Sequence, residues 1–156
     1  MLASNQVMLD MKRILAPVDF SETSDKAFDY ALSLARAFEA EVIALHVLQE
    51  PILYQPHTAQ EYRDEFERTI QRKLSDLLHR HTCEGVKITT MMKPGAPFLE
   101  TIQVASGQDC DLIVIGTHGH GPIHNMLLGS CVEKVVRKAR CPVLVVRPGQ
   151  HQFIAP

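Results

Sequence analysis

The sequence lacks tryptophan, has only 6% aromatic residues, and carries a formal net charge of −2 from 16 lysines and arginines against 18 aspartates and glutamates. So small a net charge argues against duplex nucleic acid or an anionic membrane as a partner held by bulk charge. Its purely apolar runs, such as Leu112–Ile115 and Val143–Val146, are far shorter than the roughly 20 residues of a membrane helix. With 46% hydrophobic residues among 156, the chain is expected to form one globular domain.

The cysteines also exclude a class of protein. Cys83, Cys110, Cys131 and Cys141 are scattered and form no CxxC pair, which predicts reduced thiols rather than a disulfide framework. No basic residue precedes Lys12, so the charged start of a signal peptide is missing. We therefore expect a cytoplasmic protein.

Five short runs rich in Val, Ile and Leu alternate with longer patterned segments. The runs are Ile14–Val18, Glu41–Leu48, Val86–Met91, Leu112–Ile115 and Val143–Val146. Continuous apolar runs of this length are typical of strands buried on both faces of a parallel sheet.

The segments between the runs have apolar residues at helical spacing. Ser21–Ser24 offers an N-cap for the first helix, Pro97 suits the first position of the third, and Gly107 suits its C-terminal cap. Strictly alternating strands and helices predict a doubly wound, three-layer α/β sandwich. Ligands of such sheets bind beyond the carboxyl ends of the strands, here after Val18, Val47 and Ile115.

The segment from Gly116 to Ser130 is the most informative part of the chain. It contains four glycines and ends in Gly129-Ser130, at the expected start of the last helix. Glycines let backbone amides approach an anion, and a helix N-terminus presents unpaired donors, so the segment favours phosphate binding. Its spacing fits neither a Walker A loop nor a dinucleotide-binding G-x-G-x-x-G motif. The alternative is a connection whose glycines only satisfy turns.

The spacing Gly116-x2-Gly119-x9-Gly129-Ser130 resembles the ATP-binding signature G-x2-G-x9-G-[ST] of the universal stress protein family. Three further segments resemble that family in the same order along the chain. They are Arg13–Ser21 at the first strand, Leu45–Val47 at the end of the second, and Cys141–Arg147 at the last. The resemblance implies a universal stress protein domain over residues 12–148, with residues 1–11 as a flexible extension and 149–156 as a short tail.

The resemblance also implies a fold and a site. The family has a five-stranded parallel sheet in the order 3-2-1-4-5, an adenine nucleotide alpha hydrolase-like sandwich, with ATP between strands one and four. By position, Pro17, Val18 and Asp19 would line the adenosine, Val47 would contact the adenine, and Gly116 would pass under the ribose. Thr117 would belong to the same site. The residues expected around the phosphates are His118, Gly119, Gly129, Ser130 and Cys131.

Several of these residues allow a second interpretation. Asp19 would hydrogen-bond the ribose or approach a phosphate-bound Mg²⁺, or would only cap the turn that follows it. His118 stands where many relatives carry a basic residue, which predicts pH-dependent affinity. Together with His120 and His124 it also admits a Zn²⁺ site, although the spacing fixes no geometry. Cys131 is either a thiol activated by the helix dipole or a small buried hydrophobe.

Histidines outside this segment suggest no chemistry of their own. His46 lies inside an apolar run and is expected to be a core histidine with its hydrogen bonds satisfied. His79 and His81 end an exposed helix, where no specific role is expected.

The expected function is that of a nucleotide-responsive stress or regulatory module that acts through a protein partner. The resemblance further implies a homodimer formed through Val143–Val146, because an apolar edge strand needs cover. No nucleophile, base and acid stand at a convincing spacing, so no catalytic residue is assigned. Two alternatives remain: a slow ATPase in which Asp19 or a loop histidine positions water, and an interaction protein that binds no nucleotide.

Overall fold

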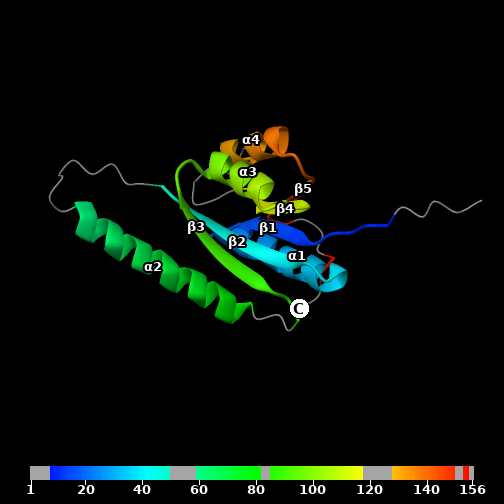
Figure 1. The fold of residues 1–156 in the computed structure, drawn as a ribbon, viewed down its shortest axis with the longest axis horizontal. Helices are drawn as coiled ribbons and strands as arrows, with labels where there is room; N and C mark the ends of the chain where they lie inside the picture. Colours follow the sequence, from blue (N-terminus) through cyan, green and yellow to red (C-terminus); the bar gives the residue numbers. More distant parts are fainter. Residues whose placement is uncertain (1–7, 50–58, 82–84, 118–127, 150–152, 155–156) are drawn as a thin grey trace, which may run out of the picture.

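The computed structural model in Figure 1 describes residues 8–49, 59–81, 85–117, 128–149 and 153–154. Strands and helices alternate along the chain as β1 (Arg13–Pro17), α1 (Glu22–Phe38), β2 (Glu41–Leu48), α2 (Ala59–Arg80), β3 (Ile88–Pro94), α3 (Pro97–Gly107), β4 (Leu112–Gly116), α4 (Ser130–Lys138) and β5 (Val143–Val146). All neighbouring strands are parallel, and their order is β3-β2-β1-β4-β5. The predicted doubly wound sandwich and its strand order are confirmed.

The sheet separates two hydrophobic clusters, as the alternation of side chains along each strand requires. On one face Ile14 packs with α1 and α2, which contribute the fully buried Phe28 and Leu77. On the other face Leu15 packs with α3 and α4, and Val135 of α4 is fully buried there. Figure 1 shows these two helix pairs on opposite sides of the sheet. The core is therefore divided between the two sheet faces.

Burial on both faces holds only for the central strands. The apolar residues of β1, β2 and β4 are mostly buried, whereas β3 alternates between half-buried and exposed positions and Val143–Val145 of β5 are half-buried. The third strand also begins and ends later than its apolar run, at Ile88–Pro94 instead of Val86–Met91. Because its register against Val42–Leu48 sets its limits, an edge strand need not follow its own apolar content.

The helix ends follow the sequence signals in two of three places. Ser21 caps α1, since its Oγ accepts a hydrogen bond from the Ser24 amide at 3.2 Å. Pro97 occupies the first position of α3. The predicted cap at Gly107 is wrong: α3 ends at that residue, and the left-handed conformation falls on Asp109, with φ 49°.

His81, one residue beyond α2, has a specific contact that its sequence context did not indicate. Its Nδ1 lies 2.6 Å from Oδ1 of Asp29 on α1, and its ring stands edge-on to Phe28 with centroids 5.6 Å apart. The expectation of no specific role is therefore wrong, because His81 ties the end of α2 to α1.

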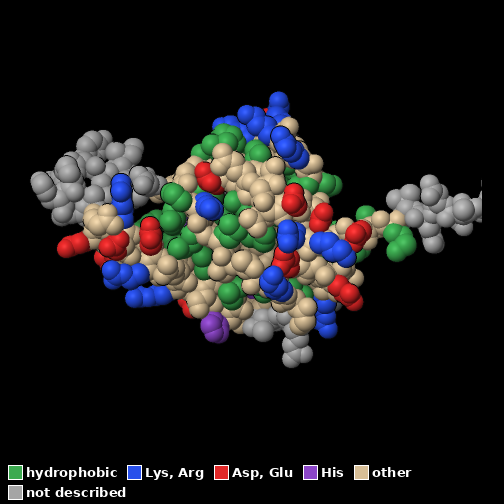
Figure 2. All heavy atoms as spheres, in the orientation of Figure 1, with side chains coloured by type: hydrophobic (Ala, Val, Ile, Leu, Met, Phe, Trp, Pro, Cys, Tyr) green, Lys and Arg blue, Asp and Glu red, His purple; other side chains and the backbone are tan. Residues whose placement is uncertain are grey.

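Charged groups of both signs are mixed over the face drawn in Figure 2, with basic side chains gathered over α4 at the top. Arg137 and Lys138 lie in the last turn of α4, where the helix dipole favours cations. None of the helices in the described ranges combines the length and apolarity needed to span a bilayer.

Candidate functional site

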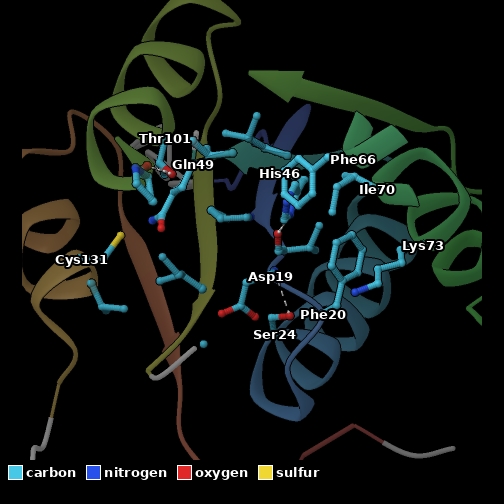
Figure 3. Close-up of a pocket in the computed structure, with 18 of the residues that line it drawn as sticks. Asp19, Phe20, Ser24, His46, Gln49, Phe66, Ile70, Lys73, Thr101 and Cys131 are labelled. Atoms are coloured by element: carbon cyan, nitrogen blue, oxygen red, sulfur yellow. Dashed lines mark hydrogen bonds between the residues drawn. The ribbon is translucent and has the colours of Figure 1, made fainter. Parts of the chain in front are cut away.

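A cavity of about 650 Å³ opens at the carboxyl ends of β1, β2 and β4 (Figure 3). Its volume lies within the roughly 300–1,000 Å³ of small-molecule sites. This is also the edge at which a doubly wound sheet binds its ligands, between the strands where the chain order reverses. The lining residues are Pro17, Val18, Asp19, Phe20, Ser24, Leu45, His46, Val47, Gln49, Tyr62, Phe66, Ile70, Lys73, Pro97, Thr101, Ile115, Gly116, Cys131 and Val132.

Asp19 lies in the tight turn between β1 and α1 and is half-buried in the cavity wall. Its Oδ1 accepts a hydrogen bond from the Ser21 amide at 3.0 Å, and its own amide donates to Ser24 Oγ at 3.3 Å. The turn-cap interpretation is thus correct for the Ser21 amide. Because the same carboxylate lines the cavity, the cap also holds it in place beside the strand ends.

Gly116 ends β4 and packs directly against the start of α1. A Cβ built on Gly116 would lie 2.9 Å from the carbonyl carbon, the carbonyl oxygen and Cγ2 of Thr23. The next residue, Thr117, is fully buried and donates its amide to the Val146 carbonyl at 2.9 Å. Gly116 is therefore a glycine because the helix approaches the strand closely, whereas Thr117 is not among the described residues that line the cavity.

The first turn of α4 borders the cavity through Cys131 and Val132. Gly129 is the N-cap: its amide donates to the Thr117 carbonyl at 3.0 Å, and no side-chain cap hydrogen bond is made within the part of the chain that the structure describes. Because the first helical hydrogen bond joins the Glu133 amide to the Gly129 carbonyl, the amides of residues 130–132 have no carbonyl of their own helix to bind. Such a helix end attracts anions.

Burial raises the pKa of the Cys131 thiol, although the residue stands in the first turn of a helix. Cys131 is half-buried and packs against the hydrophobic cluster of the α3–α4 face. Desolvation therefore outweighs the helix dipole that the redox interpretation relied on, and the structure favours a small buried side chain at this position.

His46 stands in the cavity wall and not in the core. Its Nδ1 lies 2.8 Å from the Val18 carbonyl, so the expectation that its hydrogen bonding is satisfied is confirmed at this nitrogen. The ring packs on Phe20, with centroids 4.8 Å apart and planes inclined by 30°. Burial lowers the pKa of His46, which keeps the imidazole neutral near pH 7.

The α2 side of the cavity consists of residues for which the sequence predicted no ligand contact. Tyr62, Phe66 and Ile70 line it from one helix face, and Lys73 follows them on the same helix. Their spacing of three or four residues does predict a common inward face. The pattern cannot show that this part of α2 extends past the strand ends, where it walls a cavity in place of covering the core.

The predicted site residues are only partly brought together. Six of them line the cavity: Pro17, Val18, Asp19, Val47, Gly116 and Cys131. Gly129 and Ser130 adjoin it at the start of α4. His118 and Gly119 lie outside the described residues, as do His120 and His124. Within the described residues, no group of three or more His, Cys, Asp or Glu side chains is placed to hold a metal ion.

Comparison with known proteins decides the family. The model of the universal stress protein family matches residues 11–147. The chain is a member of the universal stress protein family. It is 35% identical to universal stress protein MJ0531 of Methanocaldococcus jannaschii over 142 residues, which cover 87% of this chain and 82% of that one.

Solved universal stress proteins share the fold. The structure of MJ0577 from the same archaeon matches with a TM-score of 0.78 and 31% identity, over 92% of this chain and 100% of that one. Two more distant members were solved with nucleotides. One, in complex with cAMP, has a TM-score of 0.63 at 22% identity, and one from Archaeoglobus fulgidus, in complex with dAMP, has a TM-score of 0.60 at 21% identity. They cover 88% and 89% of this chain and 98% and 99% of their own.

Proposed function

We propose that this universal stress protein binds ATP in the cavity at the strand ends and passes the bound state to a protein partner in the cytoplasm. The observation that carries the proposal is the meeting of three features at one opening. These are an apolar cleft at the ends of β1 and β4, a carboxylate fixed at its edge, and a helix N-terminus whose first amides have no acceptor within their own helix.

Each part of an adenine nucleotide has a matching group. The apolar side chains of Val18, Val47 and Ile115 line the cavity and suit a base. The carboxylate of Asp19 can accept a hydrogen bond from a ribose hydroxyl. The amides of residues 130–132 suit phosphate oxygens, because the helix dipole adds partial positive charge at that end. The cAMP and dAMP complexes support the proposal at the level of the fold, since they show that this fold holds adenine nucleotides.

The proposal includes Mg²⁺ bound through the nucleotide phosphates. Magnesium in nucleotide sites commonly takes one or two carboxylates and fills its other positions with phosphate oxygens and water. Asp19 is the single acidic side chain among the described lining residues, so it is the carboxylate assigned to this role. When bound, the ion would supply positive charge against the phosphates.

Calorimetric titration with MgATP tests the proposal, with the melting temperature as a second measurement. Ligand at 100 times its dissociation constant adds about 2.7 kcal/mol to the folded state. For a chain of this length that corresponds to about 5–10 °C. Asp19→Asn keeps an oxygen for the Ser21 amide but removes the charge, so we expect about tenfold weaker MgATP binding. Asp76→Asn, at an exposed position of α2 outside this cavity, is the matched control.

Two results would contradict the proposal. If millimolar MgATP produced no heat of binding and no rise in melting temperature, the result would favour an interaction protein that binds no nucleotide. Steady release of phosphate that is lost in Asp19→Asn, with ATP still bound, would favour a slow ATPase instead.

We further propose that two chains associate through β5. This strand pairs with β4 on one side and ends the described sheet, and Val143, Leu144 and Val145 are only half-buried. If a second chain covered these residues, their apolar area would be removed from water and the sheet would no longer have an open edge there. Light scattering should then give twice the 17.5 kDa chain mass. A chain-sized mass at high micromolar concentration would contradict the dimer.

A further inference from the structure

The cavity has two sides, separated by the ends of the strands. Val47 and Cys131 belong to the α3–α4 face of the sheet, whereas His46, the neighbour of Val47 on β2, points to the opposite face and packs on Phe20. Figure 3 shows Cys131 on one side of Asp19 and Phe66, Ile70 and Lys73 on the other. The five residues Phe20, His46, Phe66, Ile70 and Lys73 are named the α2 corner below. Apart from Asp19 and its neighbours in the strand-end turns, the residues proposed to contact nucleotide lie on the other side.

The α2 corner has flat aromatic walls and an apolar floor. The rings of Phe20 and His46 pack in a tilted arrangement, with centroids 4.8 Å apart and planes inclined by 30°. Phe66 is half-buried against the cluster of the α1–α2 face, and Ile70 is only 4% exposed. Walls of this kind favour a flat apolar group, because an aromatic guest can contact the edges of the wall rings or stack on a ring face that is exposed.

Phe20 is held in a conformation that a bulky residue rarely adopts. Its φ is 65°, in the left-handed region, while the turn around it is fixed by the hydrogen bond from Ser21 to Asp19. Strained backbone of this kind persists where the surrounding structure imposes it and is concentrated at ligand sites. Here it places the Phe20 ring in the cavity wall, between His46 and Lys73.

Among the described residues that line the cavity, Lys73 is the one Lys or Arg side chain, and it stands at the opening of the α2 corner. Lys73 is exposed, and its Nζ lies 5.5 Å from the centroid of the Phe20 ring. Asp76 borders an adjoining hollow together with Phe20 and Lys73, but Lys73 takes part in none of the ion pairs between described residues. Asp19 is the one acidic side chain in the described wall of the cavity itself. The ammonium group is therefore available to an anionic substituent on a ligand whose apolar body lies against the rings.

We infer that the α2 corner is a second ligand subsite, which binds a flat aromatic anion such as an aromatic carboxylate or sulfonate beside the nucleotide site. The aromatic body would lie against Phe66 and the exposed edges of the packed Phe20 and His46 rings, and the anionic group would meet Lys73. The subsite does not depend on nucleotide binding, because its walls come from α2 and from the β1 and β2 ends on the α2 side.

The test uses anilinonaphthalene sulfonate, a flat aromatic anion whose fluorescence rises in apolar surroundings. We expect one dye per chain, with the same affinity within twofold at saturating MgATP. Lys73→Met should weaken dye binding about tenfold, the loss expected for one charge-assisted contact, and Lys73→Arg should retain it. Phe66→Leu, which keeps an apolar side chain but removes the ring, should weaken dye binding as well.

Lys138→Met is the matched control. Lys138 also stands over a phenylalanine, with its Nζ 5.8 Å from the Phe98 centroid, but neither residue lines the cavity. This variant should bind dye like the unmodified chain. Circular dichroism and melting curves confirm that each variant is folded, since dye also binds loosened proteins.

Three outcomes would overturn the inference. They are the absence of a fluorescence change, equal affinity of Lys73→Met and the unmodified chain, and displacement of the dye by MgATP. If the chain bound no nucleotide, the lysine and phenylalanine variants would still decide for or against the α2 corner. Failure of the proposed function and failure of this inference are thus separately observable.

Discussion

Replacing Gly116 by alanine should destabilise the protein in the absence of any ligand. A Cβ at this position would lie 2.9 Å from three atoms of Thr23, closer than Cβ atoms approach other heavy atoms in folded proteins. Two of the three belong to the backbone of α1, which cannot rotate away as a side-chain end can. Relief requires α1 to shift from β4, and overpacking of this kind costs about 1–3 kcal/mol.

The free energy of unfolding, measured by urea titration without nucleotide, checks this value. For a chain of this length a loss of about 1–3 kcal/mol lowers the melting temperature by about 2–12 °C. Gly107→Ala is the matched control, because Gly107 is helical and a Cβ there would meet nothing within 4 Å. That variant should be about 0.5 kcal/mol more stable, since alanine restricts the unfolded chain more than glycine does.

A second substitution shows which atoms cause the strain. Adding Thr23→Ala to Gly116→Ala removes the close Cγ2 but leaves both carbonyl atoms in place, so it should restore only part of the lost stability. If Gly116→Ala were as stable as the unmodified chain, close packing would not explain this glycine. Its presence would then have to be explained by the ligand alone.

Two further predictions concern titratable groups. The carboxylate of Glu41 pairs with two cations: its Oε2 lies 2.7 Å from Lys87 Nζ, and its Oε1 lies 2.5 Å from Arg13 Nε. Hydrogen bonds from Lys87 and Arg13 lower the pKa of this carboxyl. The stability that these ion pairs contribute should be complete above the unfolded pKa of about 4.3 and should be lost as the pH falls through the lower folded pKa. In urea unfolding measured over a pH series, Glu41→Gln should therefore lose less stability than the unmodified chain as the pH falls. An equal loss in both proteins would contradict this role of Glu41. Burial raises the pKa of Cys110 to about 11, so at pH 8 only about 0.1% of it is thiolate. Mass spectrometry should find Cys110 unmodified by iodoacetamide in the native protein and modified in urea, and rapid native modification would refute its burial.

The sequence predicted the parts of the site whose chemistry depends on local pattern. The spacing from Gly116 to Ser130 predicted the start of the last helix, and α4 does begin at Ser130, while phosphate binding there stays a prediction. Asp19 was placed at a strand end by the apolar run before it, and it lies there in the cavity wall. Patterns of this kind are reliable because strand, turn and helix start are set by neighbours in the chain.

Contacts between segments that are distant in the chain could not be predicted from such local patterns. The pairing of His81 with Asp29 links residues 52 positions apart, and nothing around either residue indicates the other. The raised pKa of the Cys131 thiol depends on its burial in the α3–α4 cluster. Position in a helix could be predicted, but the surroundings that determine the pKa could not.

By itself, the sequence determined the alternation of strands and helices, and through the right-handed crossover rule the three-layer architecture and the edge at which a ligand is expected. Only the tertiary structure decided which residues share the cavity. It placed Phe66 and Lys73 of α2 opposite the turn that holds Phe20, and it brought α1 against Gly116 so closely that a methyl group would not fit. The physical reason is that backbone preference acts over a few residues, whereas a cavity is bounded by whichever segments the packing of the whole chain brings together.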